Sequence, residues 1–313
     1  MSRIHEALKK AAQERSAKQS EGFTADIADL SAERIATETP VVRTTISVPA
    51  QTMPSLSELS APTVRPEIEQ FLAHCVHPEW KPEPKLNVFD SAAKSLAGLE
   101  RFRTLRSRLL QISTAQPLQR ILVTSSVPEE GKTFVAANLA QSFIRQSGRR
   151  VLLIDADMRA SRLHLHFGVP QGPGLSEYLK GEAELTQVVQ VNPEGNLCLI
   201  PGGGHVTNAS ELVHSEKMKN MLESVSRLFD WVILDSPPAL AVYDASILAD
   251  MCDGVLFVVR AGYTEFSVAE RASGEFKNKN LLGVVLNRVD DSETYGGHYY
   301  YDVTPEGAPR GKS

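Results

Sequence analysis

Cysteine is scarce in this sequence of 313 residues, with three copies at positions 75, 198 and 252 that form no CxxC or metal-ligand spacing. This scarcity argues against a disulfide framework or a cysteine-based metal site, and reduced thiols are expected instead. A basic surplus is also missing, because the formal net charge is -5. An acidic balance argues against a general nucleic-acid binder.

Long apolar runs are absent as well. The most apolar run, residues 255–259, has the length of a strand, whereas a membrane-spanning helix needs roughly 18–20 apolar residues. The N-terminal sequence MSRIHEALKKAAQERSAKQS lacks the apolar segment of a secretion signal. We therefore expect a cytoplasmic protein that reaches a membrane indirectly or through a surface-lying helix.

The first 18 residues predict a short amphipathic helix. Ile4, Leu8 and Ala11 recur at helical spacing, and basic residues occupy the other faces. Such a helix could dock on a partner or on an anionic membrane surface. The alternative is a solvated tail whose weak apolar stripe packs on its own domain.

Residues 19–91 are rich in Ser, Thr and Pro and show no sustained hydrophobic period. A segment of this composition cannot bury enough apolar surface to offset its ordering entropy, so we expect a largely disordered linker. Residues 67–90 are ambiguous, because Phe71, Leu72 and Trp80 favour partial docking.

From residue 92 the pattern is regular. A helix is expected over 92–113, and further helical stretches at 134–146, 211–229 and 268–277 separate short apolar runs. Short apolar strands that alternate with helices indicate a parallel sheet covered on both faces. The expected strands are 121–123, 151–154, 197–200, 231–234, 255–259 and 282–286. Residues 92–290 are therefore predicted to form an α/β domain with a doubly wound parallel sheet, followed by a flexible tail over 291–313.

A P-loop follows the first expected strand. Residues 126–133, SVPEEGKT, match the pattern GxxxxGK[ST] except that Ser126 replaces the first glycine. In such a loop, backbone N–H groups and the helix N-terminus hold phosphates. Lys132 would reach the β and γ phosphates, Thr133 would bind magnesium, and Gly131 would let the backbone approach closely. The loop predicts an ATP and Mg²⁺ site, in the fold class of a P-loop NTPase.

Acidic residues end two other expected strands. Asp155 and Asp157 follow the strand 151–154, and Asp235 follows the strand 231–234. Ligands of an open parallel sheet bind beyond the carboxyl ends of its strands, where these aspartates are expected to lie. A carboxylate there can hold the water shell of magnesium.

Several motifs resemble those of bacterial tyrosine autokinases (BY-kinases) of capsular and exopolysaccharide export loci, in particular the CpsD- or CapB-like cytoplasmic type, which is related to the ParA and MinD ATPases. The string IDADMR at 154–159 resembles the family's second Walker-A-like motif, and ILDSPP at 233–238 resembles its D[ST]PP motif. Glu100, Arg103 and Arg106 match an ExxRxxR motif. Shorter matches are GLSEYL at 174–179, NASEL at 208–212 and GVVLN at 283–287. The similarity covers about residues 92–290.

This resemblance implies roles for individual residues. The implied catalytic residues are Lys132, Asp155, Asp157 and Asp235; the implied nucleotide-binding residues are Ser126, Glu130, Gly131, Lys132, Thr133, Phe134 and Asn287; and the implied metal ligands are Thr133, Asp155 and Asp235. Asp155 is the candidate for accepting or orienting the tyrosine hydroxyl proton, although the sequence leaves open which of Asp155 and Asp157 contacts it. Asn287 is expected near the adenine.

The resemblance also implies a phosphoacceptor, an assembly and a partner. Four of the seven tyrosines, Tyr295, Tyr299, Tyr300 and Tyr301, lie in the tail, where a neighbouring subunit could phosphorylate them in trans. The alternative is an aromatic terminus that packs back on the domain. Glu100, Arg103 and Arg106 would mediate a ring-like homo-oligomer, unless they only form a salt-bridged helix face. A membrane polysaccharide copolymerase is the expected partner, which would recruit the chain to the inner face of the plasma membrane.

Two other functions remain possible at this stage. A ParA- or MinD-type ATPase would carry a signature lysine at residue 127, where this chain has Val127. A catalytically weak nucleotide switch could regulate a copolymerase by binding alone. The membrane-targeting helix of a ParA- or MinD-type ATPase is C-terminal, where this chain has a tyrosine-rich tail, so both features favour the kinase. The sequence leaves the nucleotide switch open.

Overall fold

The computed structural model describes residues 66–89, 96–146 and 148–289. The expected N-terminal helix, the first part of the expected linker and the tyrosine-containing tail lie outside these described residues. Within them, no helix is both long enough and apolar enough to cross a bilayer.

A seven-stranded sheet forms the centre of the described chain, in the order β3-β4-β2-β5-β1-β6-β7. All neighbouring strands run parallel except β3, which pairs antiparallel with β4. The strands are β1 (Arg120–Ser125), β2 (Val151–Asp155), β3 (Gln190–Val191), β4 (Leu197–Ile200), β5 (Trp231–Asp235), β6 (Gly254–Arg260) and β7 (Leu281–Asn287). The predicted doubly wound α/β fold is thereby confirmed.

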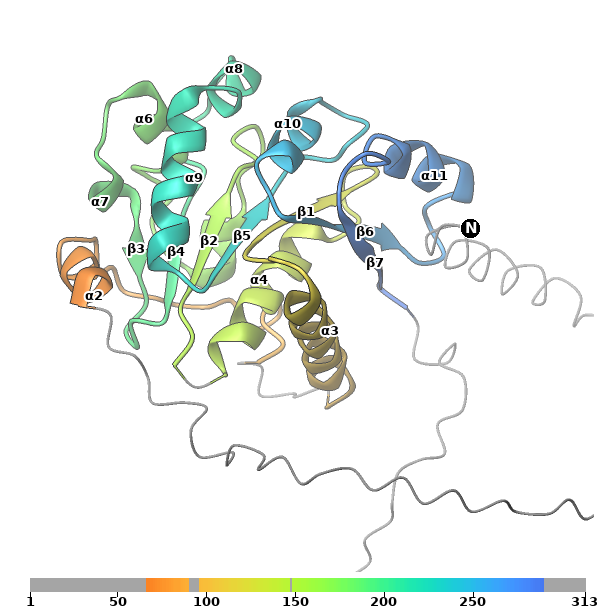
Figure 1. The fold of residues 1–313 in the computed structure, drawn as a ribbon, viewed down its shortest axis with the longest axis horizontal. Helices are drawn as coiled ribbons and strands as arrows, with labels where there is room; N and C mark the ends of the chain where they lie inside the picture. Colours follow the sequence, from red (N-terminus) through yellow and green to blue (C-terminus); the bar gives the residue numbers. More distant parts are fainter. Residues whose placement is uncertain (1–65, 90–95, 147, 290–313) are drawn as a thin grey trace, which may run out of the picture.

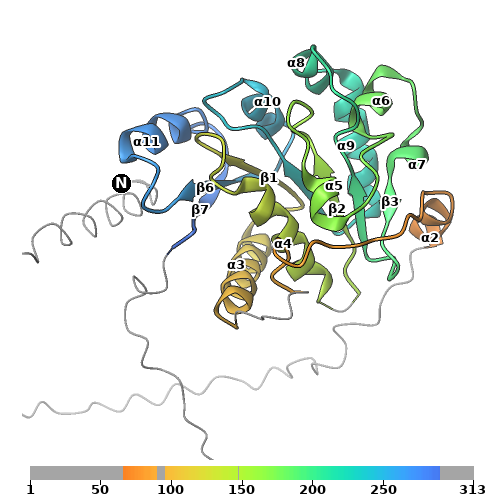
Figure 2. The same cartoon turned by 180° about the vertical axis from the view of Figure 1, so that it is seen from behind.

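Helices cover both faces of the sheet, with α9, α10 and α11 on one side and α3 and α4 on the other (Figures 1 and 2). The described helices are α2 (Pro66–Ala73), α3 (Leu96–Ala115), α4 (Lys132–Ile144), α5 (Leu163–Phe167), α6 (Leu175–Lys180), α7 (Leu185–Val188), α8 (Ala209–Val213), α9 (Glu216–Leu228), α10 (Asp244–Asp250) and α11 (Phe266–Gly274).

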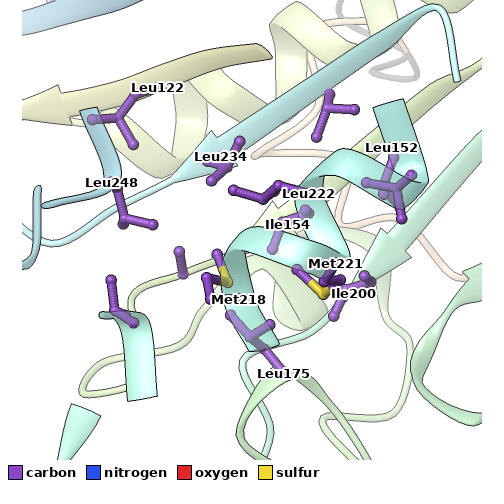
Figure 3. Packing of buried hydrophobic residues seen from close by; sticks show 14 of the residues in the cluster. Leu122, Leu152, Ile154, Leu175, Ile200, Met218, Met221, Leu222, Leu234 and Leu248 are labelled. Atoms are coloured by element: carbon purple, nitrogen blue, oxygen red, sulfur yellow. The ribbon is translucent and has the colours of Figure 1, made fainter. Parts of the chain in front are cut away.

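Successive residues of the strands enter two different cores, because their side chains alternate between the two faces of the sheet. In β2, Leu152 and Ile154 pack with α9 and α10, whereas Val151 and Leu153 pack with α3 and α4. Figure 3 shows the first core, in which Met218, Met221 and Leu222 of α9 lie against strand residues such as Leu152 and Leu234. Burial on both faces explains why these strands appear in the sequence as unbroken apolar runs.

One predicted helix is wrong in its extent. The stretch 211–229 is divided into α8, which ends at Val213 with His214 as its C-cap, and α9, which Ser215 caps at its N-terminus. The Ser215 hydroxyl accepts a hydrogen bond from the backbone N–H of Met218, as an N-cap serine does. The remaining predicted helices are present, with ends shifted by a few residues.

Residues 66–89, which we call the strap, lie mostly in the stretch that the sequence left ambiguous between linker and partial docking, and they pack on the domain. Ile68 and Leu72 of α2 are buried in the core beside α9. Val76 then forms a bridge with Gln190 at the edge strand β3, and the Trp80 indole donates to the carbonyl of Val191 over 2.9 Å. The strap fails to show in the composition because Pro and Glu separate its few apolar anchors. The folded domain therefore begins before the expected boundary at residue 92.

Candidate nucleotide-binding site

The predicted P-loop lies between β1 and α4, and α4 begins at Lys132. Two residues of the loop, Glu129 and Gly131, have left-handed backbone angles, with φ of 66° and 96°. Such angles turn backbone N–H groups toward one side of a loop, which creates a concave site for an anion. The amino end of α4 adds its own unpaired N–H groups and positive dipole to the same place.

Gly131 is required by contact as well as by conformation. A Cβ atom at this position would lie 2.0 Å from Nδ2 of Asn287. That amide also donates a hydrogen bond of 2.8 Å to the carbonyl of Glu130. Asn287, at the end of β7, therefore holds the P-loop in place, which the sequence motif alone did not reveal.

Glu130 was expected to bind the nucleotide, but its side chain is directed into the protein. It is fully buried, and Oε2 accepts a hydrogen bond of 2.8 Å from the backbone N–H of Val127. Oε1 accepts from the hydroxyl of Thr264 at 2.5 Å. The side chain thus braces the loop against the segment after β6, and only the backbone of Glu130 remains for contact with a phosphate.

Ser126 and Phe134 flank the loop. The Ser126 hydroxyl is buried and has no hydrogen-bond partner among the described residues. The ring of Phe134 packs near those of Phe102 and His166, with centroid distances of 6.0 and 6.5 Å. At Phe134, the part suited to an anion is therefore the backbone N–H in the first turn of α4.

Three aspartates meet behind the loop, as the strand ends predicted. Asp155 and Asp235 are register partners on the adjacent strands β2 and β5. Asp157 forms an ion pair of 2.9 Å with the Lys132 ammonium. The Asp235 carboxylate is hydrogen-bonded to the Thr133 side chain. These contacts place Lys132, Thr133 and the three carboxylates in one site.

Two carboxylate oxygens in this site are buried without a partner in the described chain: Oδ1 of Asp155 and Oδ1 of Asp235. The second oxygen of Asp155 accepts three hydrogen bonds, from the Ser161 hydroxyl at 2.8 Å and from the backbone N–H groups of Arg162 and Leu163 at 3.0 Å each. Buried polar atoms are normally satisfied, so an orphaned pair points to a ligand.

Burial dominates the electrostatics of the site. It raises the pKa of Asp235, against the lowering effect of Lys132, and raises the pKa of Asp155, against its hydrogen bonds to Leu163 and Ser161. Burial by itself would lower the pKa of Lys132, but the charges of Asp235 and Asp157 outweigh it and raise that pKa. Lys132 therefore stays protonated, and the surplus of negative charge favours a bound cation.

Arg159, the last residue of the IDADMR motif, ties the site to the NASEL segment. Its Nε donates to Asp244 over 3.2 Å, and an Nη donates to the Ser210 hydroxyl over 2.9 Å. Asp244 is almost completely buried at the start of α10 and also accepts a hydrogen bond from Ser210. Asp244 lies far from both motifs in the sequence, so no local pattern could have linked it to them.

The residues expected to mediate oligomerisation lie on α3. Arg103 pairs with Glu100 over 2.5 Å on the exposed face of this helix. Arg106 instead donates to the carbonyl of Ser142 in α4 over 2.6 Å. Arg106 therefore has an intramolecular role, while Glu100 and Arg103 remain accessible. The four expected phosphoacceptor tyrosines lie outside the described residues.

The loop between β1 and α4 contains residues with left-handed backbone angles, and buried aspartates lie at the ends of the adjacent parallel strands. Together these features define a P-loop nucleotide-binding protein. Residues 128–269 match the family model described as an AAA domain. The chain is 36% identical to the tyrosine-protein kinase YwqD of Bacillus subtilis over 205 residues, which cover 64% of this chain and 85% of YwqD. It therefore belongs to the bacterial tyrosine-protein kinase family.

Other relatives differ in length. The chain is 34% identical over 196 residues to the tyrosine-protein kinase ptk of Acinetobacter johnsonii, and the match covers 62% of this chain but 27% of ptk. Among solved structures, the kinase domain of the Escherichia coli tyrosine kinase ETK superposes with a TM-score of 0.57 at 34% identity, covering 63% of this chain and 80% of that domain. These relatives favour the kinase interpretation over a ParA- or MinD-type ATPase.

Proposed function

We propose that this protein transfers the γ-phosphate of ATP to tyrosine hydroxyls, including those of its own tail, and so acts as a protein-tyrosine autokinase. The observation that carries the proposal is the joint placement of Lys132, Thr133, Asp155, Asp157 and Asp235 at one end of the sheet. Family membership supplies the class of acceptor. Phosphoryl transfer has a loose transition state, so positioning and charge neutralisation provide most of the catalysis.

The residues of the site fit magnesium. Within the described chain, no group of three or more His, Cys, Asp or Glu side chains is arranged to hold a metal ion by itself. Mg²⁺ commonly takes one or two carboxylates and completes its shell with phosphate oxygens and water. The unpaired Oδ1 atom of Asp235, with the Thr133 hydroxyl, would hold it. When bound, it would neutralise phosphate charge.

Lys132 would exchange its ion pair with Asp157 for the phosphates of ATP. Its ammonium lies at the start of α4, within reach of an anion cradled by the loop. Asp155 remains our candidate for orienting the acceptor hydroxyl, because three hydrogen bonds fix its carboxylate while Oδ1 stays unpaired. Burial raises its pKa to about 6, which suits a group that accepts a proton near neutral pH.

The wider setting follows from the family resemblance. Subunits would assemble as a ring-like homo-oligomer through the exposed Glu100–Arg103 face, and the tail of one subunit would reach the site of its neighbour. The partner would be a membrane polysaccharide copolymerase that recruits this chain to the inner face of the plasma membrane. The regulated process would then be polysaccharide polymerisation and export.

A kinase assay on the purified full chain tests the proposal. Incubation with ATP and Mg²⁺ should produce phosphotyrosine, and Lys132→Met and Asp155→Asn should abolish it. Replacing Tyr295, Tyr299, Tyr300 and Tyr301 by Phe should remove most of the signal. The control is Tyr243→Phe, which changes a tyrosine that is 68% exposed outside the tail and should leave the signal intact. ATP hydrolysis without phosphotyrosine would instead identify a nucleotide switch or a ParA-like ATPase.

A further inference from the structure

A groove runs between α3 and β7, on the side of the sheet that α4 covers. Its volume is about 940 Å³, and its lining is mostly apolar, with Phe102 and Leu105 on one wall and Val284, Val285 and Leu286 on the other. Both views of the fold show α3 beside this edge of the sheet (Figures 1 and 2). One end of the groove reaches Phe134 and Asn287 next to the P-loop, while the rest extends away from the phosphate site.

The strand that forms one wall has a free edge. β7 is the last strand of the sheet, and within the described residues it pairs only with β6. None of its residues is fully buried, and Leu286 is 41% exposed. An edge of this kind presents a row of unpaired backbone groups to any extended segment that can lie beside it.

The chain itself continues from this groove. Arg288 and Val289 follow β7 directly and line the cavity, and Val289 is the last described residue. Arg288 has a left-handed φ of 56°, an uncommon angle outside glycine. Residues in this conformation occur where the chain turns back on itself.

The charge and composition of residues 290–303 complement those of the groove. Residues 290–303, DDSETYGGHYYYDV, contain four acidic residues and neither lysine nor arginine. Three exposed basic residues without an ion pair in the described chain line the groove: Lys85, Arg108 and Arg288. Arg101 also lines it, as does Glu100, whose carboxylate is paired with Arg103. An acidic segment rich in tyrosine suits an apolar groove with a basic rim.

We propose that residues 293–301 of the tail fold back as an antiparallel strand on the free edge of β7 of the same molecule. Nine extended residues span roughly 30 Å, which exceeds the roughly 23 Å of a seven-residue strand. Residues 289–292 form the turn. Alternate residues of a strand share a face, so Tyr295, Tyr299 and Tyr301 point together into the groove, and Tyr300 points away. Addition of a strand to an open edge is an established mode of peptide binding.

This docking is a binding event that is measured without nucleotide, so its failure can be distinguished from a failure of the proposed kinase activity. It gives the acceptor tyrosines a defined position in their own subunit, from which they must be released before any transfer to a neighbour. Two alternative occupants are tested against this proposal: the tail of a second copy of the chain, and the N-terminal segment 1–65.

Hydrogen–deuterium exchange distinguishes these occupants without nucleotide. The full chain is compared with a chain truncated after Val289, and the β7 amides are followed at several protein concentrations. We expect exchange in β7 at least about tenfold slower in the full chain, independent of concentration, with β3 at the opposite edge unchanged. Leu286→Lys, an exposed substitution in the groove, should remove most of the protection.

A synthetic peptide of residues 290–303 provides the second measurement. Added in excess to the truncated chain, it should restore protection of β7. Equal exchange of β7 in the full and truncated chains overturns the proposal and leaves the groove to segment 1–65 or to another protein. Protection that increases with protein concentration also overturns it, because the tail then comes from a second copy.

Discussion

Replacement of Gly131 by alanine tests how the P-loop is held. Gly131 has a φ of 96°, and a Cβ atom there would lie 2.0 Å from Nδ2 of Asn287. A non-glycine residue in such a conformation costs roughly 1–3 kcal/mol. Displacement of Asn287 would also break its hydrogen bond to the Glu130 carbonyl, which is worth about 1 kcal/mol. We expect Gly131→Ala to lower the free energy of unfolding by roughly 2–4 kcal/mol, with the two costs added.

The two contributions can be separated by urea denaturation of four variants. Gly195 also has a positive φ, 68°, but nothing lies within 4 Å of a Cβ placed there, so Gly195→Ala reports the conformational cost alone. Asn287→Ala should cost about 1 kcal/mol in the parent and almost nothing in the Gly131→Ala background, where the hydrogen bond is already lost. Strictly additive costs would refute the contact between Gly131 and Asn287 as the reason for glycine.

Two further predictions concern the charged residues of the site and of α3. Burial raises the pKa of Asp235 to about 7, so the stability linked to this group is complete below its unfolded-state pKa of about 4 and is lost as the pH rises through about 7. Asp235→Asn should therefore raise the melting temperature of the nucleotide-free protein at pH 8 and change it little at pH 4, while kinase activity is lost. An unchanged melting temperature at pH 8 would contradict the assigned cost of burying the charged carboxylate. Arg103→Glu should shift the protein toward monomer in sedimentation velocity without lowering its melting temperature, because Arg103 is exposed and, among the described residues, its side chain pairs with Glu100 of the same helix. Lys81→Glu, in the exposed ion pair of Lys81 with Glu79, is the control, and equal sedimentation of both variants would exclude Arg103 from the interface.

The sheet could be predicted from the sequence because both of its faces are buried. Residues 151–154 and 231–234 are unbroken apolar runs followed by aspartate, and the structure places those aspartates in register at one edge. β3 was missed because it consists of two residues whose pairing depends on β4 and on the strap. A strand this short leaves no period to detect.

The site was predictable where its residues act within a local motif, and not where they act across the fold. Lys132 and Thr133 lie in consecutive positions, so a pattern identifies them. The hydrogen bond between Thr264 and Glu130 joins residues 134 positions apart, and the bond from Ser210 to Asp244 crosses 34 positions. Such contacts depend on how strands are ordered in the sheet, which no single segment specifies.

The ion pair between Lys132 and Asp157 gives the site an internal competitor for the phosphates of a nucleotide. The Asp157 carboxylate oxygen lies 2.9 Å from the Lys132 ammonium nitrogen, which a phosphate would also need to bind, and both side chains are largely shielded from water. Nucleotide affinity then depends on the difference between two binding free energies: that of Lys132 for the nucleotide phosphates and that of Lys132 for the Asp157 carboxylate. A partner protein that bound and displaced the loop after β2 would weaken the ion pair between Asp157 and Lys132. Nucleotide binding would then become tighter, although the partner does not contact the nucleotide.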